Sequence, residues 1–319
     1  MFDGLRARLR QRFESWARPR TPEPLPIAID RRRVYVIPTG FGLFFALLLA
    51  TMGLGALNDN NNPALLLALL LAGAAQASLI AAHLQLSGLE MIAFGAEPVP
   101  AGEAISLRIH LRATDGRGRR GLRVECGEEA TSASLVDGAG EAVVELPTTR
   151  RGWLQPPKLR ISTRQPLGLA FAWCHAWPQA QLLVYPHPER DAPPLPIGGG
   201  EGSRARPHVA GDEPHHLRAY RQGDPRRGIA WKPSARHGNL LVREYERREG
   251  AEIVLDWREP GALPTEARIS RLARWVDEAE RRNLRYRLRL PGQTLGPAQG
   301  PAHRHACLRA LALLPHAVG

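Results

Sequence analysis

The sequence contains little cysteine and almost no lysine. Its cysteines, Cys126, Cys174 and Cys307, form an odd, widely spaced set of three without a Cys-x-x-Cys pair. Such a set excludes a disulfide framework and the usual ligand spacing of a structural zinc site, and it is typical of a compartment where thiols stay reduced. Only two of the 43 basic residues are lysine, and the formal net charge is +12. Because the arginines are spread along the chain and no nucleic-acid-binding motif accompanies them, this charge does not predict a nucleic-acid partner.

Charged residues are missing from two long stretches near the N-terminus. Residues 39–57 and 64–86 contain no Lys, Arg, Asp or Glu, and the polar turn between them is rich in asparagine. An α-helix needs about 20 apolar residues to cross a hydrocarbon layer about 30 Å thick. We therefore predict a transmembrane hairpin rather than a signal peptide, which would be a single shorter segment followed by a cleavage site. A buried helical hairpin in a soluble core is the alternative.

The arginines on one side of these stretches predict an orientation. Arg31, Arg32 and Arg33 and six further arginines precede the first stretch, whereas the turn has none. Because positive residues stay in the cytoplasm, we expect both termini on the cytoplasmic side. Leu5, Leu9, Phe13 and Trp16 share one face of a possible interfacial helix that would contact membrane lipids; a frayed basic tail explains the same residues.

After residue 88 the long apolar stretches give way to short alternating patterns of apolar and polar residues. Residues 105–111 alternate apolar and polar side chains, and similar short runs recur, bounded by Gly, Pro or Asp. This spacing predicts an antiparallel, immunoglobulin-like β-sandwich over residues 89–186. The segment from Pro186 to Pro196 and the glycine-rich tract 198–203 predict a flexible exit from it.

Helical and strand periodicities return in the last 70 residues. We predict a buried strand over 253–257, a helix over 265–282, a strand over 284–290 and a last helix over 305–314. The fold class is therefore multidomain: a transmembrane α-hairpin, a β-sandwich and a small α/β module. The predicted parts are a basic N-terminal segment (1–33), the hairpin (34–88), the sandwich (89–186), a linker (187–210) and the C-terminal region (211–319).

A dense motif separates the linker from the α/β module. It reads Leu-Arg-x-Tyr-x-x-Gly-Asp-x-x-Arg-x-Ile-x-Trp-x-x-Ser-Ala-Arg, followed by Leu-x-Val-x-Glu. This order closely resembles the signature of the bacterial DUF58 family. The signature residues are Tyr220, Arg221, Gly223, Asp224, Arg227, Ile229, Trp231, Ser234, Ala235, Arg236 and Glu244. Asp224 and Pro225 form an N-cap and N1 pattern, so these residues either shape a short helix and its surroundings or contact a partner.

The resemblance implies a von Willebrand factor A-like module at the C-terminus, and the chain is short for a complete one. The metal site of such modules needs Asp-x-Ser-x-Ser, because a carboxylate and hydroxyls bind a hard cation. Here Asp256 is followed by Arg258 and Pro260 at the hydroxyl positions. We predict no metal site, with Asp256 paired to an arginine. A rival metal site would use His215, His216, His303 and His305.

Other catalytic patterns are missing from the sequence. It has no Gly-x-Ser-x-Gly elbow, no Walker A loop and no Gly-x-Gly-x-x-Gly motif, so we predict no cofactor and no enzymatic activity of its own. Arg285, Arg287 and Arg289 alternate along the strand predicted at 284–290. They either protect the edge of a sheet or form a docking face for an acidic partner.

These features together favour an interaction protein over a catalyst. The resemblance implies a location in the bacterial inner membrane and a MoxR-type AAA+ ATPase as partner, with a transglutaminase-like membrane protein as a further candidate. It also implies a scaffold role in the assembly or maturation of other proteins. The alternative is a membrane-bound hydrolase or metal-dependent enzyme of unknown substrate.

Overall fold

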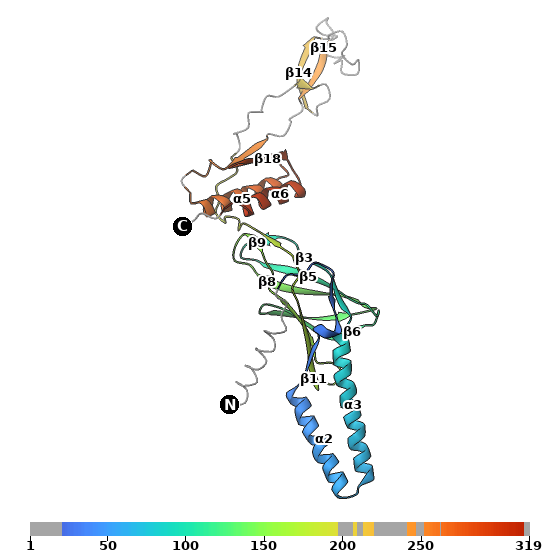
Figure 1. Ribbon diagram of the computed structural model, residues 1–319. Coiled ribbons are helices and arrows are strands. Elements are labelled where there is room, and N and C mark those ends of the chain that lie inside the picture. Colours follow the sequence, from blue (N-terminus) through green and yellow to red (C-terminus); the bar gives the residue numbers. More distant parts are fainter. Residues whose placement is uncertain are drawn as a thin grey trace. The chain divides into compact units, whose positions relative to one another are not determined.

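The computed structural model describes residues 21–196, 207–208, 213–219, 241–246, 252–261 and 263–315. The chain divides into two compact units, Met1–Val184 and Tyr185–Gly319, and each is described by itself. The first unit holds two apolar helices and several β-sheets, and the second holds a small α/β region (Figure 1). The coarse architecture expected from the sequence is confirmed.

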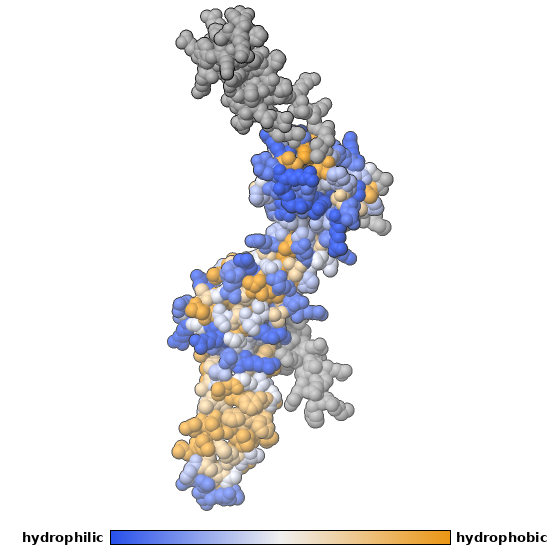
Figure 2. Space-filling view, turned by 180° about the vertical axis from the view of Figure 1, so that it is seen from behind, coloured by the Kyte–Doolittle hydropathy of each residue, from blue (hydrophilic) through white to orange (hydrophobic). Residues whose placement is uncertain are grey.

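The two apolar stretches form helices that pack against each other. Helix α2 spans Gly40–Asn58 and helix α3 spans Asn62–Leu86. The hydroxyl of Thr39 accepts from the backbone N–H of Gly42 at 3.0 Å and so caps α2. Only 6% of the most apolar 18-residue segment of α2 and 11% of that of α3 are buried. Both helices are long and apolar enough to span a membrane. Figure 2 shows their side chains as a continuous hydrophobic surface.

The rest of the first unit contains two larger antiparallel sheets and one smaller sheet. The four-stranded sheet has the order β1 (Ile27–Ile29), β3 (Leu89–Ala96), β5 (Ala104–Ala113) and β8 (Ala139–Pro147). The five-stranded sheet has the order β2 (Tyr35–Pro38), β11 (Ala170–Ala176), β10 (Leu159–Thr163), β6 (Arg119–Cys126) and β7 (Glu129–Leu135). A smaller sheet joins β4 (Val99–Pro100), β12 (Leu182–Tyr185) and β9 (Gly152–Leu154).

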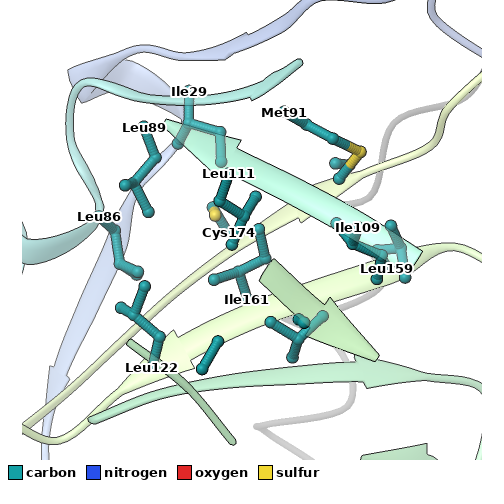
Figure 3. Close-up of a cluster of buried hydrophobic side chains, with 14 of the residues drawn as sticks. Ile29, Leu86, Leu89, Met91, Ile109, Leu111, Leu122, Leu159, Ile161 and Cys174 are labelled. Atoms are coloured by element: carbon teal, nitrogen blue, oxygen red, sulfur yellow. The ribbon is translucent and has the colours of Figure 1, made fainter. Parts of the chain in front are cut away.

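One hydrophobic core lies between the two larger sheets. On β5, Ile109 and Leu111 are buried, while Arg108 before them and Arg112 after them face outward, as the alternation predicts. Ile161 on β10 belongs to the same core, which Figure 3 shows in close-up. The core residues labelled there also include Ile29, Leu86, Leu89, Met91, Leu122, Leu159 and Cys174. The domain is therefore a β-sandwich, with the end of α3 built into its core.

Two strands of this sandwich come from before the hairpin, where the sequence analysis placed only a basic segment and the start of the hairpin. In β1, Ile27 and Ile29 lie opposite Met91 and Leu89 of β3. Strand β2 pairs with β11 from Tyr35 to Pro38. The sandwich thus does not begin at residue 89. Strands of three and four residues carry too few alternations to be recognised in a sequence.

The C-terminal unit contains a small mixed sheet and two helices. Strand β16 (Ile253–Asp256) lies parallel to β17 (Tyr286–Leu290), and helix α5 (Thr265–Arg281) connects them. Strand β18 (Gln293–Ala298), which the sequence analysis missed, adds antiparallel to β17. Helix α6 spans Pro301–Ala312 and so begins four residues before the prediction, with a proline in its first turn. The Gly-Pro pair within β18 hides its alternation.

The predicted linker is partly structured. The backbone N–H of Glu189 donates to the carbonyl of Ser270 at 3.1 Å, and its carboxylate accepts from Arg271 at 2.8 and 2.9 Å. Trp275 donates its indole N–H to the carbonyl of Pro193 at 2.8 Å. Residues 185–196 are therefore a strap bound to α5 and not the flexible exit that their prolines suggested. Prolines lack an N–H but keep a carbonyl, which side chains of a neighbouring helix can bind.

The rest of the predicted linker and the motif region is described only in part. The tract 198–203 and the predicted N-terminal interfacial helix lie outside the described residues. Strands β13 (Pro207–His208), β14 (Glu213–Ala219) and β15 (Leu241–Glu246) form a three-stranded sheet with β15 in the middle. Strand β13 falls within the range 187–210, so this range is not a pure linker.

The core gives a direct test of the sandwich. Ile161→Ala removes a fully buried side chain and is expected to lower the free energy of unfolding by about 2–5 kcal/mol. Val143→Ala changes a side chain that is 41% exposed, and it should cost no more than about 0.5 kcal/mol. Urea denaturation of the detergent-solubilised protein, followed by tryptophan fluorescence, measures both. Equal effects of the two substitutions would contradict the placement of β10 in the core.

Candidate functional site

Most of the motif that resembles the DUF58 signature lies outside the described residues. This holds for Tyr220, Arg221, Gly223, Asp224, Arg227, Ile229, Trp231, Ser234, Ala235 and Arg236, and with them for the short helix expected after Asp224. Glu244 lies on β15, opposite His216 of β14. Both interpretations of these residues, a role in the fold and contact with a partner, therefore stay predictions.

Asp256 ends strand β16, at the carboxyl edge of two parallel strands. One of its carboxylate oxygens accepts from the backbone N–H of Arg258 at 2.9 Å, and the other lies 3.9 Å from a guanidinium nitrogen of Arg289. The carboxylate thus faces an arginine, as predicted. A divalent cation would need further oxygen ligands here, where the chain supplies Arg258 and Pro260. These residues do not fit the metal site of a complete von Willebrand factor A-like module.

A second carboxylate near Asp256 has a perturbed acidity. The pKa of Glu259 is raised above its ordinary value, first by partial burial and then by the negative charge of Asp256. Trp257 lies on the same loop, and the guanidinium of Arg268 on α5 stacks over its ring at 4.9 Å from the ring centre. The loop after β16 is therefore held by local contacts, and no group of three or more His, Cys, Asp or Glu within the described ranges could hold a metal ion.

The three arginines of the predicted docking face lie together, but not at a sheet edge. Strand β17 is the middle strand of its sheet, between β16 and β18, so edge protection does not explain them. Arg287 forms an ion pair with Glu252 at 2.9 Å, and Arg289 lies near Asp256. Arg285 precedes the strand and is exposed. The face carries mixed charges, and Arg285 and Arg289 are its exposed cations.

Of the histidines proposed as a rival metal site, the two whose side chains are described, His303 and His305, do not converge. His303 and His305 are two positions apart on α6, which turns their side chains about 200° from each other. A ring nitrogen of His303 lies 3.0 Å from the carbonyl oxygen of Tyr286, whereas Nδ1 of His305 lies 2.5 Å from the hydroxyl of Tyr185. The side chains of His215 and His216 lie outside the described part of the chain.

A cysteine and a histidine that the sequence analysis did not connect lie next to each other. Cys307 Sγ is 3.6 Å from Nε2 of His303, one helical turn away on α6. The spacing of four residues within a helix could have revealed this pair. Burial raises the pKa of the Cys307 thiol to about 12, so the thiol stays protonated at neutral pH. The pair therefore lacks the thiolate that a cysteine nucleophile needs.

The chain was compared with protein-family models, curated proteins and solved structures. No family model, no curated protein and no solved structure matches this chain.

The buried thiols give a test of this site. Burial raises the pKa of Cys126 to about 11 and that of Cys174 to about 12, and all three cysteines are fully buried. We expect no cysteine of the native protein to react with iodoacetamide at about pH 8 within minutes, and all three to react in denaturant. Rapid labelling of Cys307 alone in the native protein would contradict the inert pair and indicate an activated nucleophile.

Proposed function

We propose that this chain is a membrane-anchored, non-catalytic interaction protein of the bacterial inner membrane. The observation that supports it best is the continuity of the first unit. Strands β1 and β2 come before the hairpin in the chain and β3 follows it directly, and all three belong to the sandwich. The two apolar helices and the sandwich therefore share one fold. Such an anchor holds the sandwich against the membrane surface rather than on a loose tether.

In this proposal, both termini lie in the cytoplasm. Arg31 to Arg33 precede α2, and the turn between α2 and α3 has asparagines and one aspartate but no basic residue. The positive-inside rule then places the turn on the far side of the membrane. The sandwich and the C-terminal unit follow α3 and lie in the cytoplasm.

The proposed partner is a MoxR-type AAA+ ATPase, with a transglutaminase-like membrane protein as a further one. The partner follows from the resemblance of the signature to the DUF58 family. A scaffold role in the assembly or maturation of other proteins fits a C-terminal unit whose acidic loop binds its own arginine and whose buried thiol is protonated. Arg285, which is exposed, and Arg289, which stays exposed beside Asp256, offer a docking face for an acidic surface.

Cysteine labelling in spheroplasts tests the topology. Asn60→Cys lies in the turn between the helices and Asp191→Cys lies on an exposed position of the strap, while the native cysteines are buried. A membrane-impermeant maleimide is expected to label Asn60→Cys in intact spheroplasts, and Asp191→Cys only after permeabilisation. Labelling of Asp191→Cys in intact spheroplasts would contradict the cytoplasmic location.

Co-purification tests the partner. The tagged protein is isolated from its own membranes in mild detergent with a slowly hydrolysed ATP analogue, and bound proteins are identified. We expect an AAA+ ATPase with the native chain, and a loss of at least about tenfold with Arg285→Glu and Arg289→Glu combined, because charge reversal repels an acidic surface.

The control substitution is Arg108→Glu, which reverses an exposed arginine on the sandwich instead. It should retain the ATPase. Arg236→Ala tests the signature in the same assay. If no ATPase is recovered with the native chain even after crosslinking, the proposed partner is wrong, and an equal loss with Arg108→Glu would reject the docking face.

A further inference from the structure

A surface pocket lies where the end of α3 meets the sandwich. Its volume is about 540 Å³, and its walls come from the last turns of α3, from residues 30–31 and from the loop between β5 and β6. Thr114 holds this loop against the helix end, since its backbone N–H and its hydroxyl donate to the carbonyl of Gly88 at 2.9 and 3.0 Å. The pocket is therefore a fixed feature of the first unit.

The length of α3 sets the depth of the pocket in a membrane. At about 1.5 Å per residue, its 25 residues extend about 37 Å, whereas the hydrocarbon layer is about 30 Å thick. If the far end of α3 lies at one surface of this layer, its last turns lie at the depth of the headgroups on the other. Ala81 and Leu84 on these turns line the pocket, and Leu84 is 46% exposed. The pocket lining is thus polar on one side and apolar on the other, which suits the headgroup and the acyl chains of a phospholipid.

The charges of the pocket leave two cations available. Arg119 is only 5% exposed and donates to both carboxylate oxygens of Asp115 at 2.9 Å, so this pair is neutral overall. These bonds hold the pKa of Asp115 below its ordinary value, which keeps the carboxylate ionised. Arg31 and Arg117 are exposed and form no ion pair within the described part of the chain. With Asp30 included, the lining carries one net positive charge, which matches one phosphodiester.

The wall of the pocket also holds an unsatisfied acceptor. Gln85, one residue before the end of α3, lines the pocket, and its Oε1 is buried without a hydrogen-bond donor among the described residues. Leaving a buried acceptor unpaired costs free energy. A change of the Gln85 side-chain rotamer would bring this oxygen to the pocket, where a ligand hydroxyl would donate to it.

We propose that this pocket binds the headgroup of phosphatidylglycerol from the adjoining leaflet. Arg31 and Arg117 bind the phosphodiester, the glycerol hydroxyls donate to Gln85 and Asp30, and the acyl chains lie along Leu84 and the helix below it. Choline has no hydroxyl or N–H to donate, and phosphatidylethanolamine has no net charge to match the pocket. The inference rests on insertion of the hairpin, which belongs to the proposed function.

Lipid binding to the full-length protein tests the pocket. The protein is purified in detergent and stripped of native lipid. It is then titrated with the dioctanoyl forms of phosphatidylglycerol, phosphatidylcholine and phosphatidylethanolamine, or with glycerol 1-phosphate, and bound ligand is counted by native mass spectrometry. One phosphatidylglycerol is expected, bound about tenfold more tightly than phosphatidylcholine. Arg31→Ala combined with Arg117→Ala should weaken it at least about tenfold.

Two further variants separate the headgroup contacts from general charge. Arg108→Ala removes an exposed arginine on the outer face of the sandwich and should leave the affinity unchanged. Gln85→Leu should reduce the preference for phosphatidylglycerol over phosphatidylcholine without weakening phosphatidylcholine, since only the glycerol headgroup donates to Gln85. Thermal melting of each variant confirms that it is folded.

Three outcomes would overturn the proposal. Equal affinity for both lipids, or unchanged binding by the double arginine variant, rejects the site. Tighter binding of phosphatidylethanolamine rejects an anionic headgroup. Equal affinity for glycerol 1-phosphate shows that the pocket takes a soluble phosphate instead of a lipid. Labelling of Asn60→Cys tests insertion separately, so correct topology without lipid binding rejects the pocket alone.

Discussion

The pairing of two short strands with the strands that follow the hairpin is the constraint on which the first unit depends. Ile27 and Ile29 of β1 complete the core beside β3, and β2 adds to β11 at the start of α2. Both ends of the helical hairpin are thereby held in the two sheets of one sandwich. Burial of these isoleucines and the backbone hydrogen bonds of both strands therefore stabilise the sandwich and its attachment to α2 and α3 together.

Several arginines of this protein form ion pairs with nearby carboxylates. Arg119 is buried and paired with Asp115, Arg271 holds the strap through Glu189, and Arg287 pairs with Glu252, so several arginines are tied to carboxylates. Among the exposed arginines of the described residues, Arg31 and Arg117 lie by the end of α3, and Arg285 and Arg289 lie on the C-terminal sheet, where Arg289 is near Asp256. The first pair suits a lipid phosphate and the second a protein surface, which fits an anchored interaction protein.

The sequence predicts the parts of the fold that have a long, regular pattern. The helices were expected at 39–57 and 64–86 and lie at Gly40–Asn58 and Asn62–Leu86, because an apolar run of about 20 residues without charge is rarely anything but a helix. Strands β1, β2 and β18 were missed because they are short or interrupted by proline. The strap was misread because composition does not reveal which carbonyls a distant Trp275 will bind.

The candidate sites were harder to predict, because their residues meet only after folding. The interaction of Asp256 with an arginine was expected from the local sequence, and Arg289 supplies it from a neighbouring strand. The pocket beside α3 combines Arg31, Gln85 and Arg117, which are far apart in the chain. Strand β1 and the loop after β5 bring them together, and neither contact can be read from spacing alone.

Hydrogen–deuterium exchange of the full-length protein in lipid nanodiscs tests the anchoring of the sandwich most directly. Strands β1 and β2 lie at sheet edges, so only those amides of Ile27–Ile29 and Tyr35–Ile37 that point toward β3 and β11 are paired, and these should exchange far more slowly than in an unfolded chain. Fast exchange of both segments, with β5 and β10 still protected, would show that the sandwich forms without them and would contradict a rigid anchor.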